Sequence, residues 1–563
     1  MKFSFAFLRI CLSTALLFGT TDAGNNTNVV TKTRPSLTPE PKTVLFVAHF
    51  LVNTEVNQML QVADKLQARG HQVEFIVNDL YRPKVEKAGF AVVDTTPNPF
   101  ADPQAKAASQ AAFGKALTAT TWNSYVADFF PEVMAGSAAS FEPCLVTVQN
   151  YFNKTKTPDV MVSSMFSDCA VDVAKKYDIP TGIMFASPLG HLFGYEDHVA
   201  APDSFLWSSV AQHSALWPRL RKILSLALLI GGTMDIATAQ NNVRVKHGIA
   251  PVGPPLTNWD KVAVFHTWSL GVDLARPLRP LTFSTGFVLS EYHAPKPDEL
   301  SSLDQQALQI LEQNTGGVIL AAFGTLAAPS TEMVKEIVQG LDAWILTQQP
   351  QPAAAIFILN DFSQVLLEDV LPADSKVHIM QGWVNQRMIL EHDNTQVFVT
   401  HGGQGSIAEA IYHQVPMLAI PIFGDQPNNA HRIQEAGIGR KLHFREEDVT
   451  AAAVTECLLD ITSSEAYKTN LQRQYQISAR AGGADKIANV VEDMMLWGHL
   501  DHLVPVTERV PFPANTNADL YLVLAAVLAA VLYVTYKCIA LTVACILGRR
   551  TTSVNSSSKK KLA

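Results

Sequence analysis

Charged residues are scarce in this sequence and are spread thinly along it. They make up 17% of the 563 residues, the formal net charge is −8, and no basic stripe with interleaved aromatics occurs in the interior. Nucleic-acid backbones are bound by concentrated positive charge, so the composition argues against a nucleic-acid partner. The 48% hydrophobic content is typical of a folding chain, and the length allows more than one domain.

Cysteine is also scarce, and the common metal-binding spacings are absent. Of the six cysteines, one lies near the N-terminus and two lie in an apolar run near the C-terminus, which leaves Cys144, Cys169 and Cys457 for the body of the protein. Three cysteines make no disulfide framework; one pair is possible, and whether Cys144 and Cys169 pair stays open. Neither C-x-x-C, H-E-x-x-H nor D-x-D occurs, so we expect no metal site.

Apolar runs near the two ends predict targeting and anchoring. Residues 1–23 carry basic residues around an apolar core and end in small residues, a pattern typical of a cleaved secretory signal peptide. An uncleaved membrane anchor is the alternative, but the apolar stretch is short for one. Residues 518–548 are apolar enough to span a membrane, with Lys537 able to reach the headgroups.

The residues after this span predict the orientation of the chain in the membrane. Basic residues in the segment 549–563 favour a cytosolic tail by the positive-inside rule. The lysines in the final K-K-L-A are similar to a dilysine retrieval signal of endoplasmic reticulum membrane proteins. We therefore expect a type I single-pass protein of the endoplasmic reticulum with a lumenal body. Asn25 and Asn153 lie in glycosylation motifs that would face the lumen.

The body of the chain alternates strands with helices. An apolar strand "TVLFVAHF" is followed by a helical pattern over 55–68 and a strand "QVEFIV", and a second run of the same kind begins at "GGVILAAFGT". This alternation predicts two α/β domains with parallel sheets and a ligand site between the carboxyl ends of their strands. We expect an N-terminal domain over 43–285, a linker over 286–316, a C-terminal domain over 317–470 and helices over 471–505 that return to the first domain.

The stretch "VFVTHGGQGSIAEA", Val397–Ala410, predicts a phosphate-binding turn. A strand leads into glycines and then into a helix, so backbone N–H groups and a helix N-terminus can meet a diphosphate. Gly403–Ala408 also matches the dinucleotide fingerprint G-x-G-x-x-A, and Asp425 follows at about the distance of a ribose-binding acid. A nicotinamide-dependent oxidoreductase is therefore one interpretation, although the motif lies deep in its domain.

The flanking residues favour another ligand. The segment from Gly382 to Gly439, "GWVNQRMILEHDNTQVFVTHGGQGSIAEAIYHQVPMLAIPIFGDQPNNAHRIQEAGIG", closely resembles the donor-binding signature of the UDP-glycosyltransferases. The similarity extends to "AAFGT" at Ala321–Thr325 and to "RGH" at Arg69–His71. The resemblance covers nearly the whole body. It implies a GT-B fold, two facing Rossmann-like domains, and inverting transfer of a sugar from a UDP-sugar without a metal or other cofactor.

The resemblance also assigns a donor site. The residues concerned are Thr325, Trp383, Gln386, His401, Gly402, Gly403, Gly405, Ser406, Glu409, Asp425, Gln426 and Asn429.

Each of these residue types suits a part of the donor. Trp383 can stack on uracil, and Gln386, one helical turn on, can bond uracil or ribose; a tryptophan buried in the core is the alternative. His401 can contact the diphosphate, with a charge that would stabilise the departing UDP.

The remaining assignments concern the helix after the turn and the sugar. Ser406 is expected at the helix start as cap and phosphate contact, and Glu409 completes a capping-box spacing with it; in the family the matching glutamate holds the ribose hydroxyls. Asp425 and Gln426 match the pair that reads the sugar hydroxyls, with Asn429 beside them, and Thr325 is expected at phosphate or sugar.

Three positions depart from the family pattern. Gly405 stands where the family usually has asparagine. The catalytic histidine, which the family uses as general base, is replaced at the matching position by Glu55, and the aspartate that orients it is replaced by Ser164. Glu55 can itself be the base if burial raises its pKa. Alternatively His49 or Asp168 supplies a displaced catalytic group, or the chain binds a UDP-sugar without turning it over. The structural alternative for Glu55 is an exposed residue at a helix start.

We therefore expect an enzyme that transfers a hexosyl group from a UDP-sugar to a hydroxyl of a small lipophilic acceptor. Self-association is possible. A catalytically silent UDP-sugar-binding protein is the second hypothesis, and an NAD(P)-dependent oxidoreductase is the third.

Overall fold

The computed structural model describes residues 36–50, 53–98, 104, 107, 130–154, 157–187, 216–253, 259, 261–275, 277–325, 327, 329–360, 363, 365–443, 448–505 and 518–558. The predicted signal segment, Asn25 and the C-terminal lysines lie outside the described residues.

Seven parallel strands form the first sheet, in the order β3-β2-β1-β4-β5-β6-β7. Its strands are β1 (Thr43–Ala48), β2 (Gln72–Asn78), β3 (Ala91–Thr96), β4 (Val160–Ser164), β5 (Thr181–Phe185), β6 (Ala263–His266) and β7 (Thr282–Ser284). The helical elements in this part of the chain are α1 (Asn53–Ala68), η1 (Asp79–Tyr81), α2 (Arg82–Lys87), α5 (Phe130–Lys154), α6 (Asp168–Lys176) and α7 (Leu216–Lys246).

Strand β1 shows why this sheet is buried on both faces. Its apolar side chains alternate between two cores, with Val44 and Phe46 in one and Leu45 and Val47 in the other. Because successive side chains of a strand point to opposite faces, a continuous apolar run supplies both cores at once.

Six parallel strands form the second sheet, in the order β10-β9-β8-β11-β12-β13. Its strands are β8 (Gly317–Ala322), β9 (Ala353–Leu359), β10 (Val377–Gln381), β11 (Thr395–Thr400), β12 (Met417–Ala419) and β13 (Gly439–Lys441). The helical elements in this part are η5 (Pro297–Glu299), α8 (Ser302–Gln313), α9 (Thr331–Thr347), α10 (Leu367–Val370), α11 (Gln386–Glu391), α12 (Gln404–Tyr412), α13 (Gln426–Glu435) and α14 (Ala451–Ser463). Strand β8 divides its side chains between two cores in the same way, with Val318 and Leu320 in one and Ile319 and Ala321 in the other.

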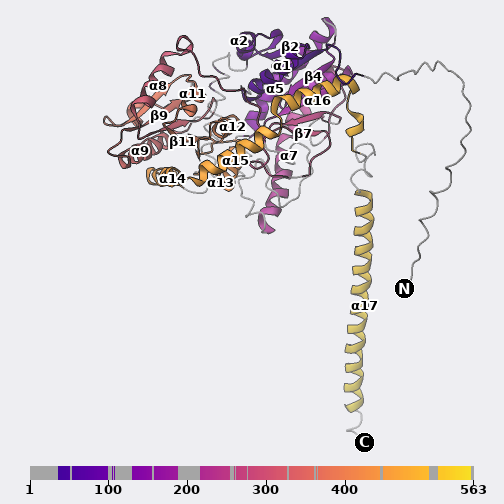
Figure 1. The fold of residues 1–563 in the computed structure, drawn as a ribbon. Coiled ribbons are helices and arrows are strands. Elements are labelled where there is room, and N and C mark those ends of the chain that lie inside the picture. Colours follow the sequence, from indigo (N-terminus) through magenta and orange to yellow (C-terminus); the bar gives the residue numbers. More distant parts are fainter. Residues whose placement is uncertain are drawn as a thin grey trace, which may run out of the picture. The chain divides into compact units, whose positions relative to one another are not determined.

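The chain returns to the first sheet after α14. Helix α15 (Ala466–Arg480) leads to α16 (Gly483–Trp497) and to η6 (Asp501–Leu503). Apolar residues of α16 join the core that contains α1, and the two helices lie side by side (Figure 1). Arg69, just after α1, forms ion pairs with Asp485 and Glu492 of α16, the second with an Nη1–Oε2 distance of 2.8 Å.

The last described helix is α17 (Ala518–Ser558). Its segment Asp519–Ala544, with a mean hydropathy of 2.2, is long and apolar enough to cross a membrane. The helix continues beyond the predicted span, since the backbone stays helical as far as Ser558.

Candidate functional site

The glycine turn lies at the carboxyl end of β11. Gly402 has a φ of +77°, a conformation that favours glycine, and Gly403 is the N-cap of α12. Gly403 as N-cap has no side chain to cap this helix N-terminus, so the first N–H groups of α12 are suited to an anionic ligand.

The expected capping box is wrong. Helix α12 begins at Gln404, so Ser406 is a buried residue inside its first turn, and Glu409 lies in the body of the helix. The two glycines let the chain turn early enough to start the helix at Gln404.

Glu409 instead meets Gln386, the first residue of α11. The Gln386 Nε2 donates to a Glu409 carboxylate oxygen at 2.6 Å. Burial raises the pKa of Glu409, opposed by the Gln386 hydrogen bond and by the charges of Arg387 and Lys84. Helix α11 begins at Gln386, with Asn385 as its N-cap, so Trp383 lies before the helix. The expectation that Gln386 follows Trp383 by one helical turn is therefore wrong. The Trp383 side chain is 71% exposed, so the alternative of a core tryptophan is wrong.

The ring of His401 lies between two glycines. A Cβ built on Gly324, in the turn after β8, would be 2.7 Å from the His401 Cε1, and one on Gly403 would clash with Nε2. Desolvation by burial lowers the pKa of His401 to about 4. The buried imidazole is therefore neutral at pH 7, and it keeps one N–H to donate. A charge on His401 beside a departing diphosphate stays a prediction.

The other assigned residues surround the same turn. Asp425 is the N-cap of α13, and burial raises its pKa to about 6 against a hydrogen bond from Asn429. The Asn429 Nδ2 also donates to the Gly402 carbonyl at 2.9 Å. The Gln426 Oε1 accepts backbone N–H groups of two preceding residues, each at 3.0 Å. Thr325 lies exposed in the turn after β8.

The N-terminal ends of α1 and α12 meet across the two sheets. Gly405 lies against Thr54, whose Oγ1 would be 3.0 Å from a Cβ at position 405. Gln58 of α1 donates to Gln404 of α12 at 3.0 Å, and Thr267, after β6, bonds both glutamines. Sequence reasoning missed Thr54, Gln58, Gln404 and Thr267, because no local pattern distinguishes them from ordinary polar residues.

Glu55 lies fully buried in the first turn of α1, so the alternative of an exposed residue is wrong. Burial is the largest influence and raises the pKa of its carboxyl from 4.5 to about 8. The Ser164 hydroxyl and the N–H groups of Met165 and Ala186 oppose this rise. None of them makes a hydrogen bond of ordinary geometry with either carboxyl oxygen. The structure thus brings together Glu55 and Ser164, the two positions that depart from the family's catalytic pair.

Asp168 has other partners than this pair. Its Oδ1 accepts the indole N–H of Trp259 at 2.9 Å. Burial raises its pKa to about 7, and the charge of Asp172 adds to the rise. It therefore belongs with the buried ion pair of Asp172 and Arg244, whose Oδ2–Nε distance is 2.7 Å.

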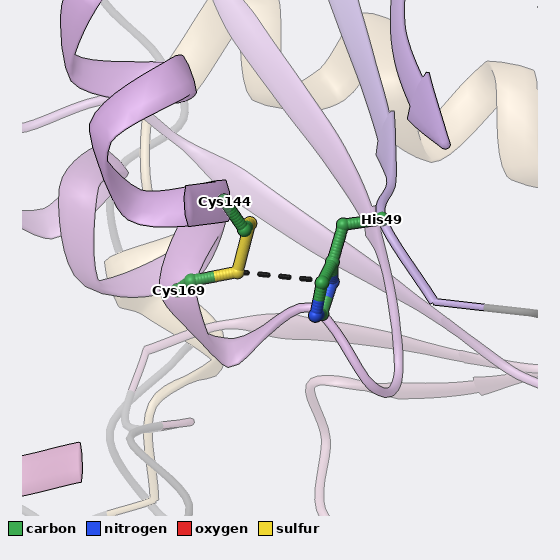
Figure 2. Close-up of side chains that lie close together, drawn as sticks. All are labelled: His49, Cys144 and Cys169. Atoms are coloured by element: carbon green, nitrogen blue, oxygen red, sulfur yellow. Dashed lines mark hydrogen bonds between the residues drawn. A yellow bond between two sulfur atoms is a disulfide. The ribbon is translucent and has the colours of Figure 1, made fainter. Parts of the chain in front are cut away.

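His49 directly follows β1 and lies against a disulfide between Cys144 and Cys169 (Figure 2). Its Nδ1 is 3.8 Å from the Cys169 Sγ and 2.8 Å from the Ser167 Oγ. The three side chains could be mistaken for a metal site, since their ligand atoms lie within 4.8 Å of one another. The disulfide leaves no thiolate for a metal to bind, so they do not fit one.

Comparisons with known proteins agree with this arrangement. The chain matches the family model of UDP-glucoronosyl and UDP-glucosyl transferase over residues 44–552. It is 26% identical to a UDP-glycosyltransferase of Talaromyces amestolkiae over 399 residues, covering 66% of this chain and 74% of that one. It is also 26% identical to UDP-glucuronosyltransferase 3A1 of Xenopus laevis over 395 residues, covering 68% and 71%.

Solved structures share the fold at low sequence identity. The glycotransferase of kitacinnamycin aligns with a TM-score of 0.59 at 17% identity, covering 83% of this chain and all of that one. The calicheamicin glycosyltransferase CalG4 aligns with a TM-score of 0.53 at 16% identity and the same coverage. The two parallel α/β sheets therefore form a GT-B fold. With the match over residues 44–552, the chain belongs to the family of UDP-glucuronosyl and UDP-glucosyl transferases.

Proposed function

We propose that this protein transfers a hexosyl group from a UDP-sugar to a hydroxyl of a small lipophilic acceptor, with inversion, and that Glu55 is the general base. The observation that carries the proposal is the position of Glu55. It is a buried carboxyl, one residue from Thr54, which touches the glycine turn of the second sheet.

The donor side supports a UDP-sugar. The exposed indole of Trp383 can stack on uracil. Glu409, held by Gln386, can accept the ribose hydroxyls. The uncapped N-terminus of α12 and the neutral His401 can donate to the diphosphate. Asp425 can accept hydrogen bonds from the sugar hydroxyls.

Inversion follows from a single displacement. The Glu55 carboxylate removes the proton of the acceptor hydroxyl while that oxygen forms a bond to the anomeric carbon. The bond from this carbon to the UDP oxygen breaks, and UDP leaves with the electron pair. The α12 N-terminus can stabilise the departing charge. We propose that no metal is required, since the sequence has no D-x-D motif.

The raised pKa suits Glu55 to this role. A carboxylate at its ordinary pKa is a weak base, whereas one near 8 takes a proton readily once it is ionised. Activity is therefore expected to rise with pH through the region of 8.

The test is Glu55→Gln in the full-length protein, assayed with a panel of hydroxylated acceptors and UDP-sugars. General-base catalysis contributes about 10²–10⁴-fold, so we expect a loss of kcat in that range with UDP-sugar affinity retained. Glu86→Gln, at an exposed position of α2, is the matched control and should keep full activity. Unchanged transfer by Glu55→Gln would rule out this base.

A second candidate function is UDP-sugar binding without turnover. The departures at Glu55, Ser164 and Gly405 favour it, because they replace the catalytic pair and the asparagine of the family pattern. UDP-sugar binding by the wild-type protein, with neither transfer nor hydrolysis of any donor, would support this function against the first.

We also propose that the protein is a type I membrane protein of the endoplasmic reticulum, anchored by α17, with a lumenal body. The candidate span Asp519–Ala544 and the exposed position of Asn153, at the end of α5, support this orientation. A glycan on Asn153 would test it, detected as a mass that glycosidase treatment removes and that the Asn153→Gln variant lacks. A cytosolic body would carry no such glycan.

A further inference from the structure

A chain of hydrogen-bonding side chains runs behind Glu55. The Ser164 Oγ lies 2.9 Å from the Ser167 Oγ, and the Ser167 Oγ lies 2.8 Å from the His49 Nδ1. The backbone N–H of His49 also donates to the Ser167 Oγ at 3.4 Å. Ser164 acts in turn on the Glu55 carboxyl. The chain therefore links two residues that sequence analysis treated as alternatives, Glu55 and His49.

The local fold holds this hydrogen-bonded chain of side chains in place. Ser164 is the last residue of β4, and the Ser167 backbone N–H donates to the Ser164 carbonyl at 3.0 Å, which closes the turn into α6. Because β1 pairs with β4, the end of β1 brings His49 to the same edge of the sheet. Ser164, Ser167 and His49 are each at most 2% exposed, so water does not compete for their hydrogen bonds.

The carboxylate sets the direction of donation. The Ser164 hydroxyl acts on the Glu55 carboxyl without a hydrogen bond of ordinary geometry. An ionised Glu55 can only accept, so in the relay Ser164 turns its hydroxyl proton toward Glu55. Ser167 can then donate to Ser164, and the His49 Nδ1–H can donate to Ser167. This order requires a neutral His49 with its proton on Nδ1. Burial lowers the pKa of His49 to about 4, which keeps the ring neutral at pH 7.

The disulfide closes the far end of the chain. The Cys169 Sγ lies beside the His49 ring, joined to Cys144 (Figure 2). A disulfide has no proton to gain or lose in this pH range. The His49 Nε2 is buried without a hydrogen-bond partner among the described residues. The ring can therefore serve the chain only through Nδ1.

We propose that Ser164, Ser167 and His49 form a relay of positioning residues that orients the Glu55 carboxylate and favours its charged form. This relay replaces the single aspartate that orients the base elsewhere in the family. It rests on the proposed role of Glu55 as base.

Asp168 directly follows Ser167, and burial raises its pKa to about 7, but its Oδ1 accepts from the Trp259 indole N–H at 2.9 Å and not from the relay. Two other titratable groups among the described residues lie near Glu55. Tyr81 of η1 interacts electrostatically with Glu55, and burial holds the pKa of its phenol above its usual range. Lys84 of α2 donates to Asn53, two residues from Glu55, at 2.7 Å. Burial lowers its pKa, while the charge of Glu409 opposes that shift. Neither of these groups forms part of the hydrogen-bonded chain, so Ser167 variants address the relay without touching them.

The experiment is the pH dependence of kcat/KM for transfer by full-length Ser167→Ala and Ser167→Thr. Without the Ser167 hydroxyl, Ser164 donates less well, and the acidic limb should move up by about one pH unit, the size expected for one hydrogen bond to a charged group. Ser167→Thr keeps the hydroxyl and should keep the midpoint of wild type. Affinity for UDP, measured separately, should be equal in both variants.

His49, at the other end of the hydrogen-bonded chain, gives a second pair of variants in case the serine variants do not fold. His49→Asn keeps a donor near the Nδ1 position and should keep the midpoint, while His49→Ala should raise it. An unchanged midpoint in Ser167→Ala or His49→Ala would overturn the relay. The Glu55→Gln profile separates the two proposals. If Glu55→Gln loses the acidic limb of the kcat/KM profile while Ser167→Ala keeps the midpoint of wild type, the relay alone is rejected. If Glu55→Gln retains the acidic limb, both the relay and the role of Glu55 as base are rejected.

Discussion

Gly405 of α12 lies against Thr54 of α1, so a side chain at position 405 would meet the threonine hydroxyl at close range. A Cβ at position 405 would be 3.0 Å from the Thr54 Oγ1. The family usually has asparagine at this position, so its replacement by glycine admits a threonine from the opposite sheet. Helix α12, which follows the glycine turn, and the helix that carries Glu55 are thereby in direct contact.

This contact predicts that substitutions at positions 405 and 54 have coupled effects on the KM for UDP-sugar. Gly405→Asn overfills the space beside Thr54, and overpacking costs about 1–3 kcal/mol, so we expect the KM for UDP-sugar to rise about tenfold or more. Thr54→Ala in the same chain makes room for the asparagine, and the double variant should recover most of the loss. Steady-state kinetics with varied donor would check this; equal KM values in wild type and Gly405→Asn would contradict it.

The meeting of Glu55 and Ser164 predicts that the family's catalytic pair can be rebuilt. Glu55→His alone lacks an orienting acid, and Ser164→Asp alone sets a second carboxylate beside Glu55. Each single variant should lose about 10²-fold or more in kcat/KM. The double variant Glu55→His/Ser164→Asp should regain at least part of that loss. Losses that simply add in the double variant would show that the two positions do not act together.

The pKa of Glu55 predicts how stability depends on pH. The carboxyl is raised from 4.5 to about 8 in the folded protein, so the folded state holds a proton that the unfolded state releases. The contribution of this group is fully present below pH 4.5 and is lost as pH rises through 8. Wild type should therefore lose stability relative to Glu55→Gln across this window, by an amount on the order of a few kcal/mol.

Thermal unfolding of both full-length proteins at a series of pH values would measure this difference. Glu86→Gln is the control, because its side chain is exposed and makes only a surface ion pair with Arg82, which contributes little to stability. A constant difference between wild type and Glu55→Gln from pH 4.5 to 8 would show that the pKa is not raised.

The exposure of Trp383 predicts an effect on binding without an effect on folding. Stacking of a base on an aromatic ring is worth about 1–3 kcal/mol, so Trp383→Ala should weaken UDP affinity by about 5–100-fold. Trp383→Phe keeps a stacking face and should lose less. Because the side chain is 71% exposed, the Tm should hardly change in either variant. Calorimetric titration with UDP would measure the affinities, and an equal affinity in wild type and Trp383→Ala would exclude this base platform.

The sequence by itself determined the architecture and the glycine turn after β11. Continuous apolar strands such as Thr43–Ala48 and Gly317–Ala322, alternating with helices, predict parallel sheets covered on both faces. The glycines at 402 and 403 predict a turn into a helix N-terminus. These features are local, because each depends on residues close together in the chain, and local patterns survive in a single sequence.

The tertiary structure alone decided which side chains act together. Glu55 and Ser164, Thr54 and Gly405, and His49 and Ser167 are separated by about a hundred residues or more, and no spacing rule links them. Whether Glu55 is an exposed helix-start residue or a buried base depends on the strands and loops packed around it, since burial is what raises its pKa. The start of α12 was likewise misjudged from Ser406, because backbone geometry at Gly402, and not side-chain type, set the first helical residue.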